Sequence, residues 1–195
     1  MKDFHEAGDL LFAVLHHHVD MTVENETPLL GAFERLGTKA VQDDLVNAYG
    51  ASATGIGGDM ARMMSAAGGR TASEHVQVEF ERMMAVESGE SGLVAAYKLA
   101  NAADITRTYL SNLPLAKSNP NIQALLHKLD KFPPPKFYAD KMRTAKLGGQ
   151  EKTITGQADK LRDTVTDIAK KTSDEDSPMG DSDNNGLPPG VKRKN

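Results

Sequence analysis

The amino-acid sequence predicts an all-α protein, and three features of the chain support that prediction. Residues 75–113 carry a long helical period with few helix breakers, and apolar residues recur at three- and four-residue spacing between Ile154 and Ile168. No segment shows the alternation of apolar and polar residues that is typical of a strand. We therefore expect a four-helix-bundle-like core with extra short helices, an amphipathic C-terminal helix and a disordered tail.

The second half of residues 75–113 has the clearest apolar face, and a break at Ser88 to Gly92 separates it from the first half. Polar residues, including Asn101, are expected on the opposite face, and Pro114 is expected to end the helix. A face rich in alanine allows another helix to approach closely. The residues assigned to that face are Ala95, Leu99, Ala102, Leu110 and Leu113.

Composition excludes several classes of protein and site. The chain has 195 residues, 39% of them hydrophobic, a net charge of -4 and no cysteine. Disulfides and thiolate metal sites are excluded, and the charge gives no reason to expect nucleic-acid binding. The first residues do not resemble a signal peptide, and no apolar run is long enough for a membrane span. We expect a cytoplasmic protein.

Changes in composition divide the chain into four parts. Residues 1–131 are predicted to form the helical bundle, and residues 132–150, rich in proline and glycine, to connect it to an amphipathic helical arm at 151–171. Residues 172–195 are predicted to be a disordered tail, because apolar residues nearly vanish there.

The arm is the predicted partner-binding element. Its apolar residues follow heptad spacing, and an isolated helix of about two heptads is marginal in water, so something must cover the apolar seam. A protein partner or a second copy of the chain is expected to bind through residues 151–171, and the alternative is a lipid surface. The residues of the seam are Ile154, Ala158, Leu161, Val165 and Ile168.

Metal binding is the alternative function. His18, Glu26, Asp59 and Glu87 fall on or near apolar faces of the expected helices and could supply a mixed nitrogen and oxygen site for Fe, Mn or Zn. Each also has an ordinary structural explanation, such as a core histidine or a carboxylate beside a break, so no resident cofactor is expected. No arrangement typical of a nucleophilic triad or a carboxylate pair stands out, and an enzyme is not expected.

The order of elements resembles the ferritin-like four-helix superfamily, particularly its rubrerythrin-related bundles. The layout that carries the resemblance is a first helix bearing His and Glu, a second helix closing on SAAGG, a third beginning near Ser73 and a fourth ending in YLSNLP. Members with a di-iron centre carry Glu-x-x-His on two helices. Residues 54–57 and 104–107, at the corresponding places, do not match that motif, so the resemblance implies a helical bundle without the di-iron site.

These observations predict a non-enzymatic helical module that acts in protein interaction or structural assembly through its C-terminal helix. The alternatives are a ferritin-like metal-binding protein and a lipid-surface-associated protein.

Overall fold

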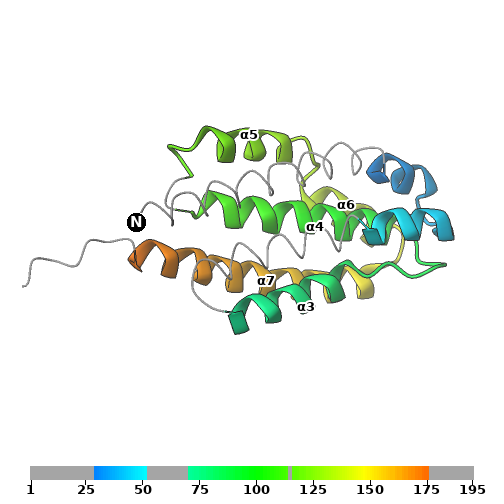
Figure 1. Ribbon diagram of the computed structural model, residues 1–195. Helices are drawn as coiled ribbons and strands as arrows, with labels where there is room; N and C mark the ends of the chain where they lie inside the picture. The colour runs from blue at the N-terminus through cyan, green and yellow to red at the C-terminus, as the bar shows by residue number, and fades with distance from the viewer. Residues whose placement is uncertain (1–28, 52–69, 114–115, 176–195) are drawn as a thin grey trace, which may run out of the picture.

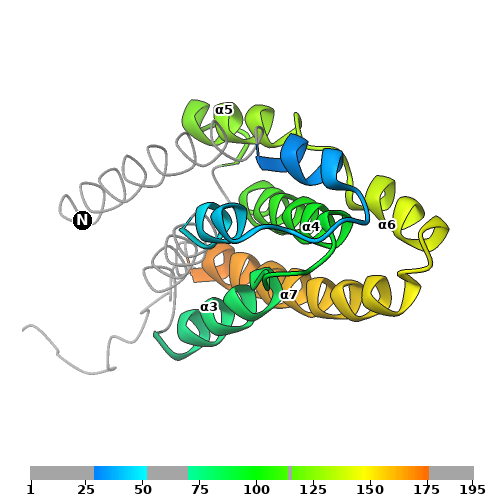
Figure 2. The same cartoon turned by 90° about the vertical axis from the view of Figure 1, so that its right-hand side faces the viewer.

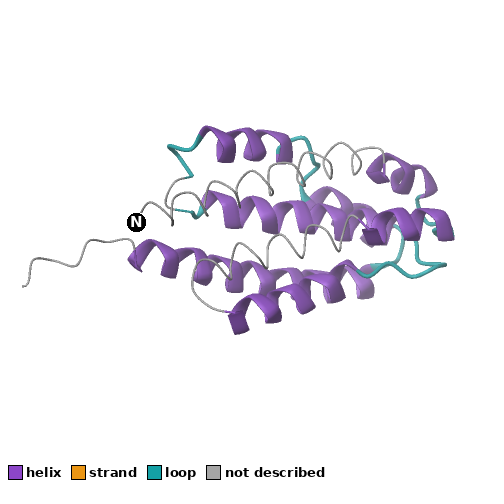
Figure 3. Ribbon diagram, in the orientation of Figure 1, coloured by secondary structure: helices purple, strands orange, loops and turns teal. Residues whose placement is uncertain are grey.

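A computed structural model describes residues 29–51, 70–113 and 116–175 of the chain. Helices make up almost all of these ranges, and the only β-type pairing within them is an isolated antiparallel bridge between Ala40 and Ser91 (Figure 3). The predicted all-α class is therefore confirmed.

The longer helices pack around one central helix. α4 (Gly92–Ser111) contacts α3 (Arg70–Met84), α5 (Pro120–Leu129), α6 (Pro135–Thr144) and α7 (Gly148–Glu175) (Figure 1). Viewed from the end, α4 lies in the middle, with α3 and α7 on one side and α5 on the opposite side (Figure 2). Two shorter helical segments, 29–36 and 43–51, precede α3.

The first half of α4 is buried on every side, whereas its second half keeps a partly exposed polar face. Asp104 and Arg107 are half-buried and Ser111 is exposed, on the face where polar residues were expected. Asn101, expected on the same face, is instead 1% exposed, and Thr106 is buried as well. Both side chains donate hydrogen bonds to carbonyl oxygens one turn earlier in α4, Asn101 to Tyr97 and Thr106 to Ala102, and the side-chain oxygen of Asn101 accepts from Arg162 of α7.

The start of α4 is fixed by a close contact with the helical segment 29–36. The hydroxyl of Ser91 accepts a hydrogen bond from the Leu93 N–H and donates one to the Gly37 carbonyl at 3.0 Å. A Cβ atom on Gly92 would lie 2.6 Å from the Phe33 carbonyl oxygen and 2.7 Å from Leu36 Cβ. Only glycine permits this approach at the first turn of α4.

Residues 132–150, the predicted connection, contain a helix of their own. They include α6, in which Tyr138, Ala139 and Met142 are buried, and Pro135 occupies the first turn, where a missing N–H costs nothing. The chain reverses at Lys146, whose φ is 63°, and Gly148 is already the first residue of α7. The double glycine therefore belongs to a helix, and the tight turn lies just before it.

The residues predicted to bind a partner are covered by the chain's own helices. α7 packs along α4, α3 and α6. Its apolar residues join the same core as those of α4, and Ile168 packs against that core partly buried. The four other predicted seam residues are nearly inaccessible to solvent: Ile154 at 4%, Ala158 at 0%, Leu161 at 3% and Val165 at 0% exposure. The heptad spacing correctly identified an apolar face that has to be buried, and α4 of the same chain buries it.

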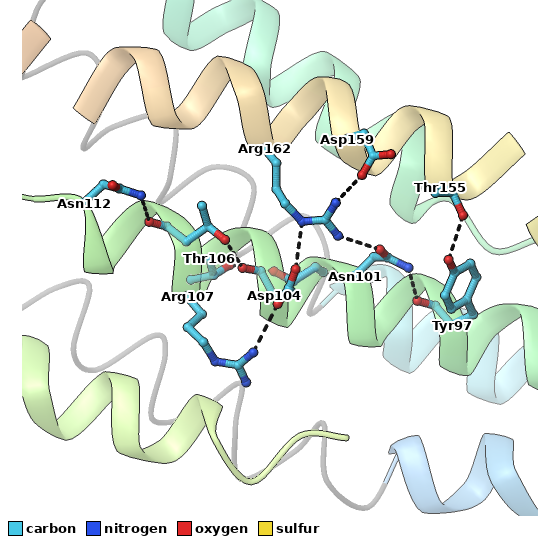
Figure 4. Close-up of polar contacts among 11 residues, drawn as sticks. Tyr97, Asn101, Asp104, Thr106, Arg107, Asn112, Thr155, Asp159 and Arg162 are labelled. Carbon is cyan, nitrogen blue, oxygen red and sulfur yellow. Dashed lines mark hydrogen bonds and ion pairs between the residues drawn. The ribbon is translucent and has the colours of Figure 1, made fainter. Parts of the chain in front are cut away.

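Polar contacts fix how α7 lies along α4 (Figure 4). The Arg162 guanidinium donates to Asp104 at 2.7 Å, to Asn101 at 3.0 Å and to Asp159. Closer to the start of both helices, the hydroxyl groups of Tyr97 in α4 and Thr155 in α7 are 2.8 Å apart. Sliding α7 along α4 would break both sets of contacts, so they select one register of the apolar packing.

α7 also runs past the end of the predicted arm, since its helix continues to Glu175. Residues 176–195, which make up most of the predicted tail, lie outside the described ranges. Within the ranges that are described, no helix combines the length and apolarity needed to cross a membrane.

Candidate functional site: a cleft with a buried ion pair

A cleft of about 630 Å³ opens where the end of α3, the loop 85–91, the first turns of α4 and the first turns of α7 meet. This volume lies within the range of small-molecule sites. Its walls combine apolar residues with charged and amide side chains: Arg82, Met83, Ala85, Glu87, Glu90, Val94, Lys98, Gly149, Gln150, Thr153, Ile154 and Gln157.

Lys98 is the unexpected residue of this cleft. It comes from the second turn of α4, among apolar neighbours, and its side chain is 11% exposed. Its ammonium group donates to the Ala85 carbonyl at 2.6 Å and to Glu90 Oε2 at 2.6 Å. Because Ala85 and Glu90 stand at opposite ends of the loop between α3 and α4, Lys98 ties the two ends of that loop together.

Glu90 is the partner of Lys98 and is not fully paired. Burial raises the pKa of the Glu90 carboxyl; Lys98 acts in the opposite direction, and the nearby charge of Glu87 adds to the rise. Its second oxygen, Oε1, is buried and accepts no hydrogen bond from the described residues. An unpaired carboxylate oxygen away from water is costly, so a donor brought by a ligand would stabilise it.

The loop that carries Glu87 and Glu90 is held in place by backbone hydrogen bonds. Val41 N–H donates to the Glu90 carbonyl at 2.7 Å, and Gly89 N–H donates to the Val41 carbonyl at 3.2 Å. Gly89 has a φ of 89°, which suits glycine and few other residues. The two carboxylates are thus presented by a constrained segment, and a ligand need not organise it.

The opposite wall belongs to α7. Ile154 contributes an apolar surface, while Gln150, Thr153 and Gln157 recur at three- and four-residue spacing and share one face of the helix. The two glutamine amides and the threonine hydroxyl can each donate and accept hydrogen bonds. The cleft therefore has an apolar interior, amides along one wall and carboxylates along the other.

The lysine and the threonine that line the cleft are engaged within the chain. The Lys98 ammonium is held by two acceptors, and Thr153, the one lining residue with a hydroxyl group, donates to the Gly149 carbonyl at 3.2 Å.

Among the described residues, only two of those predicted from the sequence as site residues lie at this cleft, Ile154 and Glu87. Ile154 alone of the predicted seam lines the cleft. Among the metal candidates, His18, Glu26 and Asp59 fall outside the described residues, and Glu87 is exposed on the loop beside the cleft. Within the described ranges, no three histidine or acidic side chains gather closely enough to hold a metal ion.

Sequence reasoning missed Lys98 and Glu90. A lysine in the middle of an Ala- and Leu-rich helix was one available signal, since a charged side chain is rarely buried unless it is paired. A second was the pair of glutamates at 87 and 90, on either side of Gly89, in the segment identified as a break. Neither signal indicates which residues meet across the fold.

Comparison with known protein families, with curated proteins and with solved structures finds no match to this chain. The functional conclusions below therefore rest on the cleft and its residues.

Proposed function

We propose that this chain is a non-enzymatic binding protein and that its ligand is a small molecule held in the cleft between α3, the loop 85–91, α4 and α7. The observation that carries the proposal is the cleft itself, in which a nearly buried ion pair, Lys98 with Glu90, lies beside an apolar interior. Ligand sites in proteins typically pair an apolar surface with a few fixed polar groups.

The sequence predicted binding without catalysis through the apolar seam of the C-terminal helix. We keep binding as the function and propose the cleft as the binding surface in place of that seam. The seam of α7 serves the core of the chain, so it is not offered to a partner. The polar face of the first turns of α7 does face the cleft, through Gln150, Thr153 and Gln157.

The test is a screen of a library of small organic fragments by ¹H–¹⁵N NMR. Fragments that bind in the cleft should shift the backbone amide signals of the loop 85–91 and of residues 149–157 together. A Thr153→Trp variant should abolish these shifts, because Thr153 is an exposed position on α7 whose enlarged side chain would fill the cleft.

Asp163→Trp is the matched control, since it places the same indole on an exposed position of the same helix outside the cleft. Fragment binding should survive this change. If no fragment shifts the cleft signals, or if Thr153→Trp leaves every such shift intact, the cleft is not a binding site.

A further inference from the structure

Two carboxylates and two cations line the cleft: Glu87 and Glu90, Arg82 and Lys98. One of the two cations, Arg82, is paired with a carboxylate outside the lining, so Glu87 has no counterpart within it. The Arg82 guanidinium is 2.7 Å from Glu79, outside the lining, and the Lys98 ammonium is taken by Glu90 and the Ala85 carbonyl.

Two acceptors remain after these pairs are formed. Glu87 is exposed on the loop and makes no ion pair with a described cation, and Glu90 Oε1 accepts no hydrogen bond from the described residues. Glu87 and Glu90 are also close enough for their charges to repel. A positively charged group beside them would relieve that repulsion.

An anionic ligand has no comparable partner here. The ammonium of Lys98 is paired within the fold, and Arg82, whose side chain is 63% exposed and already holds Glu79, offers an anion only a solvent-screened contact, while Glu87 and Glu90 would repel it. Like charges placed together in a partly desolvated site are strongly unfavourable.

The apolar part of the cleft indicates what should carry the cationic group. Ala85, Val94 and Ile154 contribute to it, Ala85 with an exposed side chain and the two core residues with the small parts that solvent reaches. A hydrocarbon stem packed there is removed from water at a gain of about 0.8 kcal/mol for each buried methylene group.

We infer that the ligand of this cleft is a small organic cation, an ammonium group on an aliphatic stem, whose charged end lies beside Glu87 and Glu90 and whose stem packs on Ala85, Val94 and Ile154. This inference rests on the proposed function. It adds the chemical class of the ligand to the location of the site.

Three probes with the same six-carbon stem test the inference: hexylammonium, hexan-1-ol and hexanoate, each titrated into the full chain and followed by the amide signals of the cleft. Hexylammonium should bind about fivefold or more tighter than hexanol, as expected for one charge-assisted hydrogen bond, and hexanoate should bind most weakly. If hexanol or hexanoate binds as tightly as hexylammonium, or if hexylammonium does not shift the cleft signals, the inference is wrong.

Two isosteric variants separate charge from shape. Glu90→Gln should weaken hexylammonium binding about tenfold, and Glu87→Gln about threefold, because Glu87 is the more exposed carboxylate. Hexanol binding should not change in either variant. Asp163→Asn, an exposed carboxylate of α7 outside the cleft, is the control and should leave all three affinities unchanged.

Because Glu90→Gln removes the charged partner of Lys98, its fold should be checked by thermal unfolding. If that variant does not fold, Glu87→Gln is the decisive variant, since the Glu87 side chain is exposed and makes no ion pair with a described cation. Unchanged hexylammonium affinity in Glu87→Gln would then overturn the inference. The two proposals fail differently: fragments that bind in the cleft without preference for a positive charge contradict only the ligand class, whereas a cleft that binds no fragment contradicts the proposed function.

Discussion

Arg162 of α7 donates a hydrogen bond to Asp104 of α4 over 2.7 Å, although the two residues are 58 positions apart in the chain. Asp104 also accepts from Arg107 at 3.2 Å, and Arg107 reaches the Leu129 carbonyl at the end of α5. Figure 4 shows Asp104 between Arg162 of α7 and Arg107 of its own helix. One carboxylate thus links the central helix to α7 and, through Arg107, to α5.

A double-mutant cycle on Asp104→Ala and Arg162→Ala should give a coupling energy of about 1 kcal/mol. Both side chains are largely buried, at 27% and 25% exposure, so solvent screens the pair less than a surface pair. The measurement is the unfolding free energy in urea. The same cycle on the exposed pair Asp140 and Arg143 should give no measurable coupling, and equal values for the two pairs would contradict this assignment.

Leu161→Asp should unfold the helical core instead of merely preventing assembly. Leu161 is 3% exposed and packs in the core that α7 shares with α4, so a buried carboxylate there would cost several kcal/mol. Loss of the cooperative thermal transition, followed by circular dichroism, is the expected result. Lys160→Asp, at the exposed neighbouring position, should leave the transition nearly unchanged. A folded Leu161→Asp protein would show that α7 is dispensable to the core.

Gly92→Ala and Gly156→Ala should change stability in opposite directions. A Cβ atom at Gly92 meets the Phe33 carbonyl and Leu36, so the variant should lose about 2 kcal/mol or more of unfolding free energy. Gly156 lies within α7 with nothing within 4 Å of an added Cβ atom, so alanine should add about 0.5–1 kcal/mol through helix propensity. The measurement is the denaturant midpoint of unfolding, which should fall in Gly92→Ala and rise in Gly156→Ala. A neutral Gly92→Ala variant would mean that the segment 29–36 does not rest on α4.

The protein should lose stability between about pH 10 and pH 12. Burial raises the pKa of Tyr109 from its usual value of about 10 to about 12. Below pH 10 the phenol is neutral in both states and the full stability is present. Above it the unfolded chain ionises first, and about 3 kcal/mol is lost as the pH rises through the folded-state pKa. Unfolding free energies measured across this range should fall less steeply in Tyr109→Phe; identical slopes would contradict a buried Tyr109.

For α4, the local sequence predicts the helix but not its place in the fold. Its helical character followed from periodicity and from the absence of breakers, but its central position did not. A helical wheel assigns one apolar face, whereas the first half of α4 buries Asn101 as well, because its amide donates to a carbonyl oxygen of α4 and accepts from Arg162 of α7. Periodicity measures how unevenly apolar residues are distributed, and a helical segment covered on all sides needs no such unevenness.

The candidate site depends on the fold still more strongly. The sequence alone determined that the chain is helical and that the face carrying Leu161 and Val165 must be covered, because these are consequences of local spacing and of the free energy of wetting apolar groups. Only the tertiary structure decided that α4 is the cover and that Lys98 meets Glu90 beside a cleft walled by Ile154. Contacts between helices depend on how the chain reverses at turns such as Lys146, and no repeat in the sequence encodes that direction.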